Sequence, residues 1–246
     1  MALHVYAVVT DEQDLPDRTG MRDEPLEPVR SGGLAAVVSR TEPDTEATEA
    51  DVIAHLDVIT DLVAAGPVIP MRFGTVAPDA DAVRQEVLDD SRSEFEEYLR
   101  ATRDVVETMV SIHFDENAAL REIMRQDRER DSWHADSMAD KIALGQTVAE
   151  SLSARVHEWG DELIQSTAGI AQAVQALDTP DHTAVRYALL VGRDRLADLD
   201  ERMRGIRPAA AGGAVPYDVE YVGPLPPVDF PLQPTSDDHG TSRWGW

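Results

Sequence analysis

The segment 106–114 constrains the fold of this chain more than any other, because its side chains alternate in character along its whole length. Val106, Thr108, Val110, Ile112 and Phe114 take one set of alternate positions, and Glu107, Met109, Ser111 and His113 take the other. A period of two predicts a β-strand with one buried and one half-exposed face. Such a strand is typical of an antiparallel sheet covered by helices on one side, so the expected fold class is α+β.

The residues before this strand supply the other elements of a first domain. Residues 3–9 and 34–39 are rich in β-branched side chains and predict two strands, joined by a long polar loop over residues 10–31. A helix is expected to open in the acidic stretch 41–48 and to end at Gly66-Pro67. Its inward side chains should be those that recur at three- and four-residue spacings: Val52, Ile53, Leu56, Ile59, Leu62 and Val63.

A short buried strand over residues 68–73 and a second helix over residues 79–103 follow. The apolar residues expected to face inward on this helix are Val83, Val87, Phe95 and Leu99. This order of elements can form one antiparallel sheet with both helices on the same face. The sequence therefore predicts a ferredoxin-like α+β domain over residues 1–114.

The character of the chain changes after Asp115, where a short helix, a highly charged stretch and a long helix over residues 139–177 are expected. The inward candidates of the long helix are Ile142, Val148, Leu152, Val156, Trp159, Leu163, Ile170, Val174 and Leu177. With Gly145 and Ser166 at two further positions, their mean spacing is about 3.5 residues, the period of a coiled coil. Gly145, Gly160 and Gly169 each weaken a single straight helix, so a break near one of them is the alternative.

Two further strands, over residues 184–191 and 217–222, and a short helix over residues 194–204 complete a C-terminal α+β domain over residues 115–230. The prolines that follow Gly223 are expected to end the last strand, because proline has no backbone donor. Residues 231–246 are polar and are predicted to form a disordered tail.

Charge and composition exclude several classes of partner and location. The chain carries 47 acidic residues against 22 lysines and arginines, a net charge of −25. Such a surface repels phosphate backbones and anionic lipids, so binding to nucleic acid or membranes is not expected. The single lysine fits either a high-salt cytoplasm or an arginine-rich codon usage. Without a membrane-length apolar run or a signal-peptide pattern, a cytoplasmic protein is expected.

No motif for catalysis, for a cofactor or for a metal ion is recognisable. Cysteine is absent, and the histidines show no paired metal-binding spacing. His113 and Asp115 would face the same side of a strand, so a metal pair there is one alternative. The favoured alternative is an ordinary strand end with a capping acid. A non-enzymatic protein is therefore expected.

One segment is more specific than these patterns. Pro70-Met71-Arg72-Phe73-Gly74-Thr75 closely resembles the V-x-P-M-R-F-G-T strand and turn of the gas-vesicle accessory proteins of the F/L (GvpF/GvpL) family. The upstream Ala54-His55 resembles the A-H-x-x-V-L helix of that family. Residues 223–230, Gly-Pro-Leu-Pro-Pro-Val-Asp-Phe, resemble its terminal G-P-W-P-P-Y-x-F, although Leu225 and Val228 replace two aromatic residues.

The resemblance makes these motif residues candidates for binding a partner: Met71, Arg72, Phe73, Gly74, Pro224, Pro226, Pro227 and Phe230. Met71 and Phe73 are expected on one face of a strand and Arg72 on the other. Arg72 is either a buried ion-pair partner or a partner-binding residue. Gly74 is expected to permit a backbone turn that a side chain would hinder.

The family resemblance also implies a function. It implies a helper in the assembly of gas vesicles that engages the hydrophobic shell subunit and other gas vesicle proteins, with no cofactor, and it does not distinguish F from L. The seam of the long helix is the surface expected to receive the shell subunit. Two alternatives stay open. A ligand- or haem-binding enzyme on a ferredoxin-like layer would need a proximal histidine or a polar pocket. A generic coiled-coil scaffold would leave the two proline-rich motifs without a role.

Overall fold

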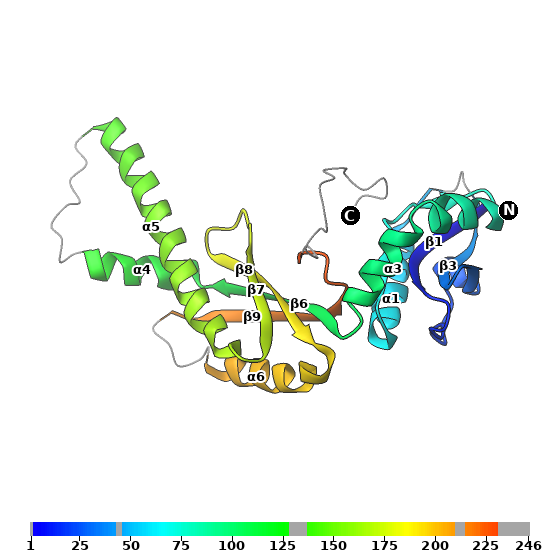
Figure 1. Ribbon diagram of the computed structural model, residues 1–246. Helices are drawn as coiled ribbons and strands as arrows, with labels where there is room; N and C mark the ends of the chain where they lie inside the picture. The colour runs from blue at the N-terminus through cyan, green and yellow to red at the C-terminus, as the bar shows by residue number, and fades with distance from the viewer. Residues whose placement is uncertain (1, 43–45, 128–136, 210–214, 231–246) are drawn as a thin grey trace. The chain divides into compact units, whose positions relative to one another are not determined.

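The computed structural model describes residues 2–42, 46–127, 137–209 and 215–230 (Figure 1). The chain forms two compact units. Unit 1 comprises the residues up to Glu107 together with the segment from Pro224 onward, and unit 2 comprises Thr108–Gly223. The division thus falls inside a strand, β6 (Val105–Phe114), rather than after it. The predicted boundary at residues 114–118 stays a prediction for limited proteolysis, and the predicted disordered tail, 231–246, lies outside the described residues.

Unit 1 contains an antiparallel sheet around the strand β1 (Ala2–Thr10). Its strands run in the order β2 (Glu27–Ser31), β3 (Leu34–Thr41), β1 and β4 (Ile69–Pro70), and β5 (Val76–Ala77) also pairs with β1. Strand β2 corrects the predicted loop over residues 10–31. It pairs with β3 across Gly32 and Gly33, whose φ angles of 55° and 87° are the positive values that a tight hairpin turn needs.

The helices of unit 1 cover both faces of this sheet. They are α1 (Glu49–Ala65), the short α2 (Ala80–Ala82), the π-helical segment η2 (Val83–Asp89) and α3 (Arg92–Ala101). His4 of β1 bonds to His55 of α1, whereas its neighbour Val5 lies in the apolar cluster that includes Val87 and Phe95. Because successive strand residues point to opposite faces, α1 and α3 lie on opposite sides. The predicted ferredoxin-like layer, with both helices on one face, is therefore not observed in unit 1.

The two helical predictions for unit 1 have different outcomes. Val83, Val87, Phe95 and Leu99 are buried as predicted, although the helix is divided after Asp89. On α1 the predicted inward set is half wrong, since Val52, Ile53 and Leu56 are exposed. The polar residues Asp51 and His55 are buried in their place, alongside Val58, Ile59, Leu62 and Val63. Apolar side chains occur on both sides of α1, so spacing alone did not identify the packed face.

Unit 2 contains a four-stranded sheet in the order β7 (Ala171–Leu177), β8 (Ala184–Gly192), β6 and β9 (Tyr217–Leu225). Its helices are α4 (Glu116–Asp127), α5 (Met138–Ile164) and α6 (Leu196–Ala209) (Figure 1). The order β6, α4–α5, β7, β8, α6, β9 is the β-α-β-β-α-β order of the ferredoxin-like motif. The topology predicted for the N-terminal region is thus found in unit 2. Strand β9 also continues through Pro224, which an edge strand tolerates.

The single core of unit 2 is apolar and joins all three helices to the sheet. It contains Val110, Ile112 and Phe114 of β6 together with residues of β8, α4, α5 and α6. The alternation predicted for residues 106–114 is confirmed except at Glu107, which is buried.

The long helix predicted over residues 139–177 ends at Ile164. A 3-10 turn, η4 (Gln165–Thr167), and Gly169, with φ at 83°, redirect the chain into β7. Residues 171–177 are therefore a strand, and the coiled-coil-like segment is wrong. Its apparent 3.5-residue period was drawn across a helix and a strand. Leu152, Val156 and Ile164 of α5 are already buried in the core of unit 2.

Candidate functional site

The Pro70–Thr75 motif forms the end of β4 and a turn in unit 1. Met71 is buried and belongs to the apolar cluster on the α3 side of the sheet. Phe73 instead packs on the rings of His4 and His55, with centroid distances of 5.7 and 5.5 Å. The prediction that Met71 and Phe73 share a face is therefore wrong, because the strand ends at Pro70. The turn closes where Thr75 donates its backbone N–H and its hydroxyl to the carbonyl of Arg72, at 3.0 and 2.7 Å.

Within this turn, Gly74 has a conformational role and Arg72 is exposed to solvent. The φ of Gly74 is 89°, and a side chain there would meet nothing within 4 Å, so the requirement for glycine is conformational. The side chain of Arg72 is exposed and forms no ion pair within the described part of the chain. The buried ion-pair alternative for Arg72 is therefore wrong.

A buried histidine pair connects this turn to α1. The Nε2 atom of His4 lies 2.9 Å from Nδ1 of His55, and Nε2 of His55 lies 3.0 Å from the carbonyl oxygen of Met71. His4 is 1% exposed and His55 is 2% exposed. His55 Nε2 donates to the carbonyl, so with both rings neutral its Nδ1 accepts the hydrogen bond from Nε2 of His4. Two segments far apart in sequence are thereby fixed together.

The environment of the pair favours the neutral rings. Burial, followed by the neighbouring His55, lowers the pKa of His4 to about 4. Burial also lowers the pKa of His55. The adjacent Tyr6 hydroxyl shares a hydrogen bond with Ser39 at 2.7 Å and accepts one from the backbone N–H of Met21 at 2.8 Å. This buried cluster is a hydrogen-bonded structural network.

An ion pair fixes the beginning of α1 beside this cluster. Arg22 donates from Nε and Nη2 to the two carboxylate oxygens of Asp51, at 3.1 and 2.9 Å. Asp51 also accepts from the backbone and hydroxyl of Thr48, which caps α1. These hydrogen bonds hold the pKa of Asp51 well below its usual range. Arg22 has a φ of 57°, so this bidentate pair holds a backbone conformation that is rare outside glycine.

The second motif, residues 223–230, ends in a segment of unit 1 that is fixed to the beginning of β6. Pro227 is buried, and the backbone N–H of Asp229 donates to Oε2 of Glu107 at 3.0 Å. Burial, together with the Asp229 carboxyl, raises the pKa of Glu107 to about 7. Phe230 is half-buried. Among the contacts of the described residues, none joins this segment to the Pro70–Thr75 turn.

Other candidate residues have structural roles or none. Asp115 accepts from the backbone N–H of Ala118 at 2.6 Å, which confirms the capping alternative over a His113–Asp115 metal pair. The described residues contain no cluster of three potential metal ligands. They also contain no helix that is long and apolar enough to cross a bilayer. His4 and His55 are enclosed and bonded to each other, so neither of these two is free to bind a haem.

Sequence reasoning did not find the His4–His55 pair or the buried Glu107. The two histidines are 51 residues apart, so no local spacing marks them. Glu107 occupies a position in the strand that alternation assigned to solvent.

Comparisons with known proteins agree with the motif resemblance. The model of the family described as "Gas vesicle synthesis protein GvpL/GvpF" matches residues 2–231. The chain is 32% identical to gas vesicle protein F of a Streptomyces species, over 94% of this chain and 99% of that protein. It is 26% identical to gas vesicle protein L1 of Halobacterium salinarum, over 92% and 89% of the two chains.

Two solved structures share the fold. The crystal structure of GvpF from Anabaena has a TM-score of 0.76 at 18% identity, and covers 92% of this chain and 96% of its own. That of GvpF from Microcystis aeruginosa has a TM-score of 0.71 at 18% identity, with coverage of 89% and 94%.

Proposed function

Because the chain belongs to the GvpL/GvpF family of gas vesicle synthesis proteins, we propose that it is a non-enzymatic accessory protein that binds the apolar shell subunit during assembly. A shell subunit must be apolar on its gas-facing side, so before assembly it exposes a surface that is prone to aggregation. The proposed role is to cover that surface in the cytoplasm and to deliver the subunit to other gas vesicle proteins.

The observation that carries this proposal is the contact between the Ala54-His55 motif of α1 and the Pro70–Thr75 turn. His55 of α1 bonds to the carbonyl of Met71 and packs on Phe73, so α1 and the Pro70–Thr75 turn are neighbours. The buried motif residues thus fix the turn against α1, and the neighbouring exposed residues are available to a partner. We assign recognition to these exposed residues, not to the buried ones.

The proposed binding surface is the outer face of α1. Val52, Ile53 and Leu56 form an apolar stripe over about one turn and are 37%, 53% and 55% exposed. This surface replaces the seam of the long helix as the proposed docking site, because Leu152 and Val156 of that helix belong to the core of unit 2. Burial of large aliphatic side chains is the expected main source of affinity.

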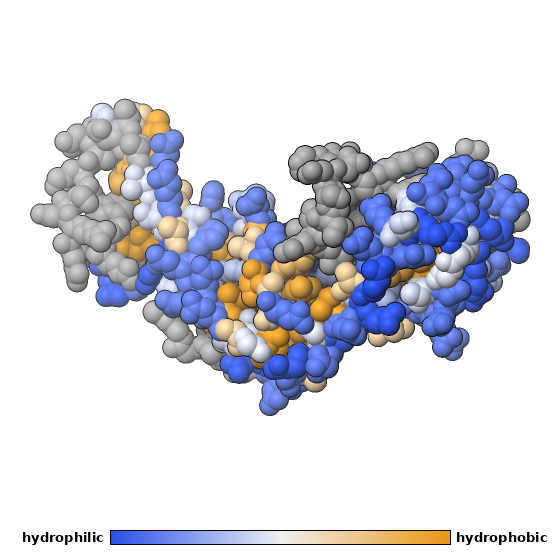
Figure 2. Space-filling model, in the orientation of Figure 1, coloured by the Kyte–Doolittle hydropathy of each residue, from blue (hydrophilic) through white to orange (hydrophobic). Residues whose placement is uncertain are grey.

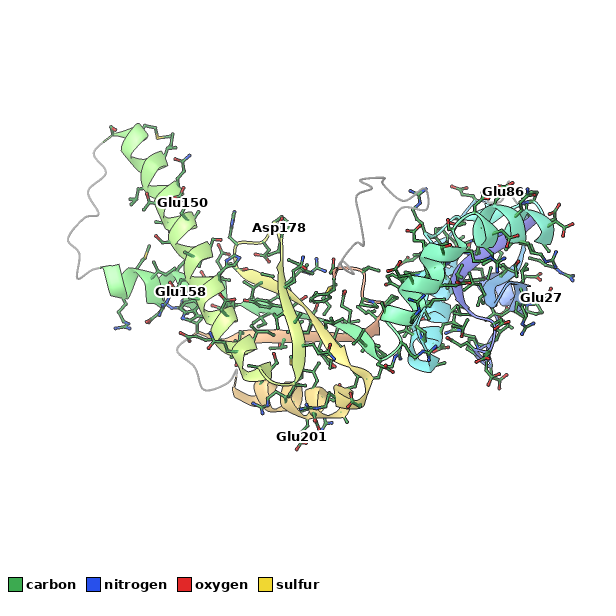
Figure 3. All side chains as sticks on the ribbon, viewed as in Figure 1. Glu27, Glu86, Glu150, Glu158, Asp178 and Glu201 are labelled. Atoms are coloured by element: carbon green, nitrogen blue, oxygen red, sulfur yellow. The ribbon has the colours of Figure 1, made fainter. Side chains whose placement is uncertain are left out.

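Acidic side chains surround the stripe and serve a second purpose. Glu49, Asp57 and Asp61 lie along the exposed part of α1, and Asp57 and Asp61 pair with Arg18 at 2.9 Å. Acids elsewhere in both units, such as Glu86 and Glu201, project away from the ribbon in Figure 3. A net charge of −25 would keep a complex with an apolar subunit dispersed through repulsion. The exposed Arg72 is the proposed cationic contact beside the stripe.

Retention of the purified shell subunit by the immobilised full-length chain tests the proposal. Binding should survive added salt and weaken in mild detergent, because buried apolar area is largely insensitive to screening. The double variant Ile53→Gln/Leu56→Gln should reduce affinity roughly tenfold or more, since about 1.4 kcal/mol corresponds to a factor of ten. Arg72→Gln should reduce binding less and leave the thermal midpoint unchanged.

Val222→Gln is the matched control, because Val222 is 55% exposed on β9 of unit 2. It should bind the shell subunit as the unmodified chain does. Equal retention by the double variant and the control would reject α1 as the binding surface. Binding that salt abolishes and detergent leaves unchanged would reject the apolar mechanism itself.

A further inference from the structure

Three of the four sheet edges in the described part of the chain carry features that discourage pairing with another chain. In unit 1, β2 contains Glu27, Pro28 and Arg30, and at the opposite edge β4 and β5 are two residues each. In unit 2, β9 contains Asp218, Glu220 and Pro224. Charged side chains, proline and very short strands are the usual means by which proteins protect the unpaired backbone groups of an edge strand.

The fourth edge, β7, has neither a charge nor a proline, and the bulge at its beginning leaves residues 173–177 regularly paired. Its sequence, Ala-Gln-Ala-Val-Gln-Ala-Leu over residues 171–177, has no charged residue and no proline, although 28% of the chain is charged. Gln172, Val174, Gln175 and Ala176 are exposed. The register with β8 shifts at Gln172, a bulge, and then stays regular from Ala173 to Leu177. Figure 2 shows apolar side chains over the strands of unit 2.

We propose that β7 is a self-association site, where the edge strands of two copies of this chain pair in an antiparallel manner. The resulting contact is isologous, because each strand presents the same residues to the other. A second copy fits the edge electrostatically. Antiparallel pairing of the regular segment 173–177 is centred on Gln175, places neutral residues opposite one another, and puts the flanking Asp178 of each copy at opposite ends of the ladder.

The net charge determines how strong this association can be. Two chains of charge −25 repel each other at low ionic strength, and the repulsion is screened once the Debye length falls to about 3 Å in 1 M salt. Two short strands also bury less than the roughly 1,200–2,000 Å² typical of stable complexes. The dimer is therefore weak, and its formation rises with protein concentration and with salt.

Sedimentation of the full-length chain over a range of protein and NaCl concentrations tests this. The unmodified chain should be mainly monomeric at 0.05 M NaCl and should shift toward dimer at about 1 M. Gln175→Lys should abolish the shift, because it places like charges across the paired strands. The same substitution also lowers the net negative charge, which by itself would weaken the repulsion between two copies and favour the dimer. Gln85→Lys, at an exposed position of η2 in unit 1, makes the identical change elsewhere and should leave the shift intact.

A second measurement uses the absence of cysteine from the chain. In Gln175→Cys the only thiols of a dimer would face each other near its two-fold axis. Directly opposed strand residues have Cα atoms about 4.5–5.5 Å apart, within the range that a disulfide spans. Mild oxidation in high salt should yield a cross-linked dimer of Gln175→Cys and not of Gln85→Cys.

A monomer at every salt and protein concentration, without selective cross-linking, would overturn the proposal. So would a dimer that persists equally in Gln175→Lys and Gln85→Lys. A chain that stays monomeric but loses shell-subunit binding in Gln175→Lys would assign the β7 edge to that partner instead. The α1 variants test the proposed function separately, since they leave β7 unchanged.

Discussion

The interiors of the two units differ in chemistry. All the buried histidine and carboxyl side chains of the described residues lie in unit 1, namely His4, Asp51, His55 and Glu107, whereas the buried threonines of unit 2 are Thr108 and Thr167. Unit 1 encloses its sheet between helices, and its motif turn is held by hydrogen bonds. Unit 2 packs α4, α5 and α6 against its sheet through one apolar cluster. Hydrogen bonds fix specific geometry at the cost of sensitivity to pH, whereas apolar packing is indifferent to pH.

The largest expected effect that separates the units comes from His55→Ala. This substitution leaves the His4 ring and the Met71 carbonyl without their partner and opens a cavity, so unit 1 should lose about 3 kcal/mol. Unit 2 should be unaffected. The measurement is thermal unfolding followed by circular dichroism and by the fluorescence of Trp159, which lies in unit 2, with the other three tryptophans replaced by phenylalanine.

His157→Ala is the control for this experiment, because His157 is an exposed histidine on α5 whose ring bonds to the Ser153 carbonyl of the same helix. It should change stability by less than about 0.5 kcal/mol. An equal shift of the Trp159 transition in His55→Ala would show that the units do not unfold separately.

The second expected difference between the units is the loss of stability on acidification. The pKa of His4 is about 4 in the folded protein and 6.5 in the unfolded chain, so the unfolded chain binds more protons between these values. With Glu107 replaced by glutamine, which removes a carboxyl of unit 1 that titrates in the opposite direction, unit 1 should therefore lose stability as the pH falls from about 6.5 to 4, by about 3 kcal/mol in full, since each pKa unit corresponds to 1.36 kcal/mol. The Trp159 transition should stay nearly constant over this range. An equal acid response of both units would contradict the difference in their interiors.

Glu107 acts in the opposite direction and should be tested by Glu107→Gln. Its raised pKa, about 7, means that the folded state retains a proton that the unfolded chain releases near 4.5. The stability that it contributes is complete below 4.5 and is lost as the pH rises through 7. Glutamine keeps an acceptor for the Asp229 backbone, so this variant should be more stable than the parent by roughly 1–3 kcal/mol at pH 8. Denaturant unfolding at pH 5 and pH 8 measures the effect, and a gain that is the same at both values would reject the assignment.

The smallest effects concern two glycines of α5 in unit 2. A methyl group at Gly160 would lie 2.5 Å from Val185 Cγ2 and 2.7 Å from the Tyr187 hydroxyl, whereas one at Gly145 would meet nothing within 4 Å. Gly145→Ala should therefore stabilise unit 2 by up to about 1 kcal/mol through helix propensity. Gly160→Ala gains the same helix propensity, but its methyl group must displace β8. Unit 2 should therefore lose about 1 kcal/mol of stability in total. The Trp159 transition reports both. If both variants are stabilised, the packing of α5 on β8 is looser than these distances require.

Local chemistry predicted much of this fold. The strands β1, β3, β6 and β8 have β-branched or alternating residues, and the turns at Gly32-Gly33 and Gly74 have the glycines that positive φ requires. The helix was predicted to include residues 171–177 because Ile170, Val174 and Leu177 continue the apolar spacing of α5, and only the pairing with β8 makes this region a strand.

The layer arrangement could not be predicted from the order of elements. The uninterrupted apolar run Val5–Val9 was the available signal that β1 is covered on both faces. The motif resemblance located the Pro70–Thr75 turn, but its contact with His55 is a tertiary contact that no spacing encodes. The exposed stripe on α1 was missed for a related reason, since apolar spacing predicts burial and does not distinguish a packed face from an exposed one.

The discontinuity of unit 1 has a consequence for synthesis on the ribosome. Residues up to Glu107 emerge first, yet the backbone donor that bonds to Glu107 lies 122 positions later, at Asp229. The early part of unit 1 must therefore wait, with the Glu107 carboxyl uncovered, while the whole of unit 2 is translated. A nascent chain interrupted before residue 224 leaves that carboxyl without its partner. The bond between Glu107 and Asp229 thus marks the full-length polypeptide, and its formation is a late step in the maturation of each molecule.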